Sequence, residues 1–130
     1  MSHFVRIKTQ IREREILVQS LRDLYYRFQE GQNLVIRGYQ QNREQAEILV
    51  NTGSQYDIGF RRTAQEYEIV ADWWGVQGNT AIRQEEFVQQ VNRQYSYNLI
   101  HNQAREQNLI VEEEKTLENG DVVLILSERG

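Results

Sequence analysis

The sequence contains no cysteine and no proline among its 130 residues. Without cysteine the chain cannot form a disulfide, an iron–sulfur site, a zinc ribbon or a thiol nucleophile, and this absence suits a reducing compartment. It also has no apolar run near the roughly 20 residues that a membrane-spanning helix needs, and its start, MSHFVRIKTQ, lacks the apolar stretch of a signal peptide. We therefore expect a single domain over residues 1–130, without membrane insertion, in a cytoplasm or a stroma.

Motifs that would carry catalysis are also scarce. The only histidines are His3, whose predicted register points toward the core, and His101, which has no carboxylate at the spacing of a catalytic triad. The glycines in WWGVQGNT (residues 73–80) lack the G-x-G-x-x-G spacing of a dinucleotide-binding turn. We expect no cofactor, no metal and no catalytic residue, so the sequence favours a protein that is not an enzyme.

Charge is distributed unevenly along the chain, whose net formal charge is −4. Residues 1–43 contain 8 basic and 4 acidic residues, whereas residues 44–130 contain 7 basic and 15 acidic residues. Thirteen of the 15 basic residues are arginine, whose planar guanidinium suits carboxylate, phosphate and aromatic partners. Compositional drift is the simpler explanation, but the bias is compatible with a recognition surface. The acidic balance without a basic stripe argues against binding of duplex nucleic acid.

Two hydrophobic periods predict the secondary structure. Side chains alternate over residues 2–11, which is typical of a half-buried strand, whereas Leu17, Leu21 and Leu24 recur at the spacing of one helix face. The predicted helices span residues 12–30, ended by Gly31, and 82–107, and the predicted strands span residues 2–11, 33–39, 47–51, 56–62, 67–73, 109–114 and 121–127.

This element order, β-α-β-β-β-β-α-β-β, predicts an α+β fold. Short turns between neighbouring strands favour a mostly antiparallel, twisted sheet of about six or seven strands, and two long amphipathic helices can cover only one of its faces. Each long helix is followed by an apparent hairpin, so the chain can be interpreted as an internal duplication.

The second face of the sheet is then open and is our predicted binding face. It combines arginines, carboxylates and aromatic side chains, and arginine, tyrosine and tryptophan are the residue types in which binding energy concentrates. The residues predicted to form it are Arg6, Arg37, Tyr39, Asp57, Arg61, Asp72 and Trp74.

Three alternatives remain open for this face. The charged residues can simply pair across the strands, without any function. A small-molecule or enzyme site could use Asp57 and Asp72, with His3, beneath the central hairpin, provided that these groups converge in a concave pocket. Aromatic side chains on an open sheet could also stack single-stranded nucleic acid, although the acidic composition argues against it.

The succession of several short segments resembles a known family. These segments are MSHFVRIKTQI at the start, IRGY at 36–39, YDIGF at 56–60, YEIVAD at 67–72 and QYSYNLI at 94–100. Their order is similar to that of the plastid and cyanobacterial family called hypothetical chloroplast frame thirty-five, or domain of unknown function twelve fifty-seven. The resemblance covers nearly the whole chain. The sequence departs from it after Trp73 and at Asn108, where relatives often have glycine.

The resemblance implies a cyanobacterial cytoplasmic or plastid stromal protein, and it implies no reaction and no ligand residue. Genes of relatives often lie near those of an AAA-type ATPase, a small companion protein and a ferredoxin-like protein, which implies work in an assembly. Together with the residue pattern, this predicts a small non-enzymatic binding or adaptor module that docks a protein partner through the open sheet face or an edge strand.

Overall fold

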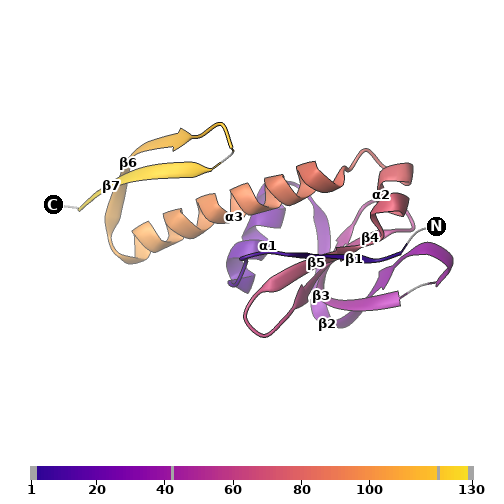
Figure 1. Cartoon of the computed structure of the whole chain (residues 1–130). Coiled ribbons are helices and arrows are strands. Elements are labelled where there is room, and N and C mark those ends of the chain that lie inside the picture. Colours follow the sequence, from indigo (N-terminus) through magenta and orange to yellow (C-terminus); the bar gives the residue numbers. More distant parts are fainter. Residues whose placement is uncertain (1–2, 42, 120, 129–130) are drawn as a thin grey trace.

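The structure, a computed structural model, describes residues 3–41, 43–119 and 121–128 (Figure 1). It confirms the α+β class and the antiparallel strand pairing. Among these residues, no helix is both long and apolar enough to cross a membrane. In chain order, the elements are β1 (Val5–Lys8), α1 (Arg14–Asp23), β2 (Arg27–Arg37), a 3-10 turn η1 (Tyr39–Gln41), β3 (Arg43–Asn51), β4 (Asp57–Arg62), β5 (Tyr67–Ala71), α2 (Trp73–Asn79), α3 (Gln84–Glu106), β6 (Leu109–Thr116) and β7 (Val122–Glu128).

The strands form two sheets and not the single sheet that the sequence predicts. Five strands pair in the order β1-β5-β4-β3-β2, and β6 pairs with β7 in a separate two-stranded ribbon. The reason is visible in Figure 1, where α3 carries the chain away from the five-stranded sheet before β6 begins. Its 23 residues span about 35 Å at the rise of an α-helix. The ribbon therefore lies beyond the reach of the larger sheet.

The first helix is shorter than predicted and does not extend to Gly31. It ends at Asp23 in a Schellman-type turn, in which the Tyr25 N–H donates to the Arg22 carbonyl and the Tyr26 N–H donates to the Leu21 carbonyl. Tyr25 takes the left-handed conformation, with φ 63°, that this turn requires. Glycine usually occupies this position, so the end of the helix at a tyrosine could not be predicted from the sequence.

The helix predicted over residues 82–107 is preceded by a separate helix, α2. Asp72 begins α2, because its side chain accepts a hydrogen bond from the Gly75 N–H at 3.2 Å. Trp73 and Trp74 are therefore the first residues of a helix and not the end of a strand.

The helices cover one face of the five-stranded sheet, as predicted. Leu17 and Leu21 of α1 and Phe87 and Val91 of α3 belong to the same buried cluster as Phe60 of β4. Residues from β3 and β5, together with Trp73 and Val76 of α2, complete this core. His3, which was predicted to face it, lies before β1 and is exposed.

The opposite face of the sheet is not the open surface that the sequence predicts. Ile36, Ala46 and Val70 form a second buried cluster there. Gly59 makes it possible: a Cβ at this position would lie 2.4 Å from Cδ1 of Ile36, so Ile36 packs directly on the β4 backbone. The ends of β2 and β3 thus curl over the sheet and bury part of the predicted binding face.

Candidate functional site

The structure divides the seven predicted binding residues into buried and accessible groups. Asp57 and Asp72 are only 2% and 1% exposed, so the prediction that they face outward is wrong. The other five side chains reach the surface to different extents. They are Arg6, Arg37, Tyr39, Arg61 and Trp74.

Asp57 is buried because Arg37 neutralises it. Its carboxylate accepts hydrogen bonds from Arg37 Nε at 2.8 Å, from Nη2 at 2.9 Å and from the backbone N–H at 2.9 Å. The hydrogen bond with Asp57 raises the pKa of Arg37, and this effect outweighs the opposing effect of burial. Arg37 Nη2 also donates to the Ser54 carbonyl at 2.9 Å. Because β2 and β4 lie on opposite sides of β3, this pair ties together strands that do not hydrogen-bond directly.

Asp72 also has a structural role. While one carboxylate oxygen caps α2, the other accepts the Tyr39 N–H at 3.1 Å, which joins η1 to the start of α2. The Tyr39 ring in turn meets the Trp74 ring edge-on, with centroids 6.2 Å apart. Asp57 and Asp72 are thus bound by different elements, and this arrangement does not support a catalytic carboxylate pair.

Arg6 and Arg61 belong to a cluster of four charged side chains. Both arginines donate hydrogen bonds to Glu44, and Glu68 lies 3.8 Å from Arg6 Nε and 3.6 Å from Arg61 Nη1. Burial alone raises the pKa of Glu44. The hydrogen bonds and charges of Arg61 and Arg6 lower it by a larger amount, so the net shift of the pKa is downward. Arg6 and Arg61 therefore take part in cross-strand ion pairs, which is the alternative without a function that the sequence left open.

Sequence reasoning missed Glu44 because it placed residues 40–44 in a turn. In the structure β3 already begins at Arg43, which brings Glu44 onto the sheet face beside Arg6 and Arg61. The signal was the pattern of opposite charges on strands that pair, and it becomes readable only once the register of β3 is known.

The accessible residues that remain form what we call the β2–α2 surface: Arg37, Tyr39, Arg43, Tyr56 and Trp74. Arg37 and Arg43 line two neighbouring depressions, of 390 and 460 Å³. Tyr56 joins them to α2, because its ring lies so close to Gly75 that a Cβ there would be 2.1 Å from Cε1. Trp74 directly precedes Gly75, and its side chain is 64% exposed. Sequence reasoning did not assign Arg43 or Tyr56 to a site.

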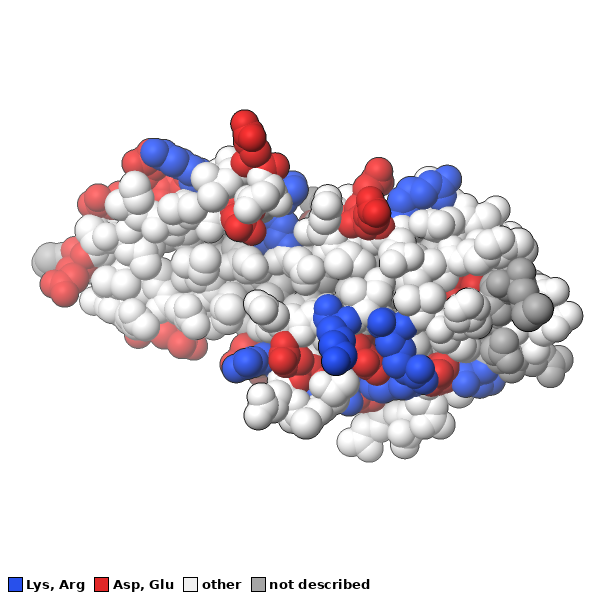
Figure 2. All heavy atoms as spheres, in the orientation of Figure 1, with Lys and Arg blue, Asp and Glu red and all other residues white. Residues whose placement is uncertain are grey.

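The charge of the five-stranded sheet region differs from that of the ribbon end. On the face shown in Figure 2, most basic side chains gather over the five-stranded sheet, and the end that carries β6 and β7 is mainly acidic. Among the described residues, no group of three or more histidine and acidic side chains is placed to hold a metal ion. The β2–α2 surface thus presents arginine and aromatic side chains in and beside two depressions.

Comparison with known proteins identifies the family. A family model described as "Protein of unknown function (DUF1257)" matches residues 20–125. The chain is 34% identical over 126 residues to "Uncharacterized protein ycf35" of Guillardia theta, and 28% identical over 128 residues to the protein of the same name from Cyanophora paradoxa. A third relative with this name, from Pyropia yezoensis, is 26% identical over 132 residues. Each match covers 97% of this chain and 96% of the relative. No solved structure matches the chain significantly. The resemblance seen in the short segments is therefore confirmed, and the chain belongs to the DUF1257 family of plastid-type ycf35 proteins.

Proposed function

We propose that this protein is a non-enzymatic binding or adaptor module that docks a partner protein through the β2–α2 surface. The observation that carries this proposal is Trp74, a large aromatic side chain left exposed next to the buried Trp73. Tryptophan and arginine are the residues that most often dominate the energy of protein interfaces. The surface includes part of β2, which is also an edge strand of the five-stranded sheet.

The guanidinium groups of the β2–α2 surface favour a partner segment that carries carboxylates, although Asp57 already compensates the charge of Arg37. Arg37 and Arg43 stand between the two depressions, so a carboxylate that reaches either depression meets a guanidinium. Arg37 is already oriented by Asp57, which reduces the conformational entropy that binding would remove. The partner would place an apolar side chain against Trp74 and carboxylates toward the arginines.

The plastid-type relatives support a cyanobacterial cytoplasm or a plastid stroma as the compartment of this interaction. Genes of relatives often lie near that of an AAA-type ATPase, as the family resemblance implies, which makes such an assembly a candidate partner. Single-stranded nucleic acid would be a poorer ligand for this surface, because the chain as a whole is acidic and repels phosphate groups.

Site-specific crosslinking tests the proposal in the native cell. A photoreactive phenylalanine analogue replaces Trp74 in one strain and Tyr25 in a second. Tyr25 is the matched control because it is an exposed aromatic residue, at 93%, at the end of α1. We expect a discrete crosslinked product at position 74 and none at position 25. Absence of a product at position 74, or the same products at both positions, overturns the proposal.

A further inference from the structure

The β6–β7 ribbon has one covered face and one uncovered face. Its inner face lies against α3. There a carboxylate oxygen of Glu114 lies 3.3 Å from Nε2 of His101, and Val122 and Leu124 are half-buried. Within residues 105–119 and 121–128 no described residue is fully buried. A two-stranded ribbon is marginally stable alone, so this one depends on α3 for its only layer of packing.

The outer face of the ribbon presents a row of β-branched apolar side chains. Ile110, Val123 and Ile125 are 40%, 42% and 44% exposed. The strand register places all three on one face, because Val123 is opposite Lys115, Ile125 is opposite Glu113 and Ile110 is opposite Ser127. An apolar row of this kind, rimmed by charged residues, is typical of a surface that a partner covers.

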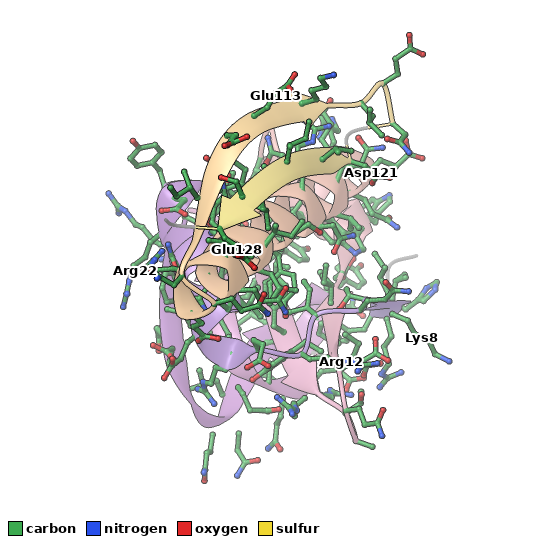
Figure 3. The ribbon with its side chains drawn as sticks, turned by 90° about the vertical axis from the view of Figure 1, so that its left-hand side faces the viewer. Lys8, Arg12, Arg22, Glu113, Asp121 and Glu128 are labelled. Atoms are coloured by element: carbon green, nitrogen blue, oxygen red, sulfur yellow. The ribbon has the colours of Figure 1, made fainter. Side chains whose placement is uncertain are left out.

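The charge of the ribbon determines which partner fits this row. Residues 109–128 contain six carboxylates and one basic residue, Lys115, which shares the outer face with the apolar row and pairs there with Glu113 at 3.4 Å, so the other carboxylates leave the ribbon acidic. Figure 3 labels Glu113, Asp121 and Glu128 on the ribbon, apart from the basic Lys8 and Arg12. A second copy would bring its own acidic ribbon, so face-to-face pairing of two ribbons is disfavoured. A basic partner complements the rim.

We propose that the outer face of the β6–β7 ribbon is a second docking surface, and that its occupant is a basic amphipathic helix of a partner protein. A helix fits because α3 already packs on the inner face of the same two strands, and the outer face offers the same strand spacing. The apolar stripe of the helix covers Ile110, Val123 and Ile125, and its lysines or arginines meet the carboxylates of the rim. This surface is at the opposite end of the molecule from α2, so it goes beyond the proposed function and adds a second partner of opposite charge (Figure 1).

Binding of a synthetic peptide to the full-length chain tests the inference. The probe is a fluorescent 18-residue peptide with leucine on one helix face and lysine on the other, and a peptide with glutamate in place of lysine is its counterpart. Fluorescence anisotropy should show binding of the lysine peptide, weakened as salt is raised, and no binding of the glutamate peptide. Hydrogen exchange should show new protection in β6 and β7, with no matching change in β3 or β4.

Paired variants separate ribbon binding from general acidity. Val123→Ser with Ile125→Ser removes most of the apolar row and keeps every charge, so the affinity for the lysine peptide should fall by about tenfold or more. Val35→Ser is the control, since Val35 is an equally exposed valine on β2; it should bind like the original chain. Circular dichroism and light scattering confirm that the variants are folded and monomeric.

Equal weakening by Val35→Ser, retained affinity in the ribbon variant, binding of the glutamate peptide or protection outside the ribbon would each overturn the inference. So would self-association of the original chain that Val123→Ser with Ile125→Ser abolishes, because a second copy would then be the occupant. These outcomes leave the crosslinking experiment at Trp74 unaffected.

Discussion

The five-stranded sheet and the β6–β7 ribbon are both antiparallel, but they achieve order in different ways. The sheet makes its own core: Phe60, Ile69 and Val70 are fully buried, and its buried Asp57 is paired with Arg37. The described part of the ribbon has no fully buried residue and presents apolar side chains to solvent. Strand pairing alone therefore does not make an element self-sufficient, and the ribbon relies on surfaces outside itself.

Helix α3 belongs to both regions and marks the boundary between them. Four of its five buried residues, Phe87, Val91, Tyr95 and Asn98, follow one stripe where it packs on the sheet and α1, and the fifth is Ala104. Asn98 donates to Ser20 at 3.0 Å and to Asp23 at 2.9 Å, which fixes α3 against α1. The ribbon lies along another side of the same helix, because Asn119 and Asp121 line a depression with Gln89 and Ser96, and Glu114 lies 3.3 Å from His101.

Core truncation in each region should give the largest contrast. Phe60→Ala should lower the free energy of unfolding by about 3–5 kcal/mol, because it opens a cavity in a closely packed core. Leu124→Ala, on the half-buried inner face of the ribbon, should lower it by about 1 kcal/mol or less, since opening of the ribbon exposes little apolar surface. Urea unfolding followed by tryptophan fluorescence and by circular dichroism measures both. Equal losses would show that the sheet and the ribbon unfold as one cooperative unit.

Tyr95→Phe tests the boundary between the regions. The Tyr95 hydroxyl accepts the N–H groups of Arg12 at 3.2 Å and of Glu13 at 3.0 Å, at the start of α1. Their loss should lower the free energy of unfolding by about 1–2 kcal/mol, a limited amount because Tyr95 lines a depression of 630 Å³ where water can reach these groups. Hydrogen exchange should show faster opening of α1, with the ribbon amides unchanged. Tyr97→Phe, on the ribbon side of α3, is the control and should not speed exchange in α1. Faster exchange in the ribbon caused by Tyr95→Phe would contradict the assigned boundary.

The sequence predicted what depends on local pattern. The hairpin of β4 and β5 follows the alternation of residues 56–62 and 67–73, and α3 follows the helical spacing of its apolar residues. The ends of elements were less predictable where one side chain decides them, as Tyr25 does at the end of α1 and Asp72 at the start of α2.

Long-range contacts account for the rest of the differences. The sequence showed a glycine at position 59, but not that Ile36 would pack against it and close part of the sheet face. It showed Arg37 and Asp57, but not that their pairing would bury the carboxylate and leave Arg37 at the edge of the candidate site. Tyr39 and Trp74 are in ring contact near Arg37, but Trp74 stands on α2 and not on the predicted sheet face, and the binding role of all three stays a prediction.

The charge cluster of the sheet should make its stability depend on pH. Folding lowers the pKa of Glu44, so its contribution to stability is fully present above about 4.3, the ordinary pKa of glutamate, and is lost as the pH falls through the folded value. Glu44→Gln should lower the free energy of unfolding at pH 7 and flatten its decline below pH 5, as measured by urea unfolding at a series of pH values. Glu113→Gln is the control from the ribbon, where the exposed pair with Lys115 contributes little. An unchanged acid decline in Glu44→Gln would show that other carboxylates dominate it.

The smallest change in the free energy of unfolding is expected at Trp73. Unlike the other buried polar groups discussed for the sheet region, its buried indole N–H has no hydrogen-bond partner among the described residues. Trp73→Phe removes this donor, whose desolvation costs about 1–3 kcal/mol, and also removes packing of similar value against neighbours such as Phe87. The two changes should nearly cancel, so the free energy of unfolding should move by about 1 kcal/mol or less in urea titrations followed by circular dichroism. Trp73→Leu keeps the donor absent but removes the aromatic contact and should be clearly less stable. A loss of several kcal/mol in Trp73→Phe itself would mean that the indole N–H is bonded in solution, for example to an internal water, and that polar pairing in the sheet region is complete.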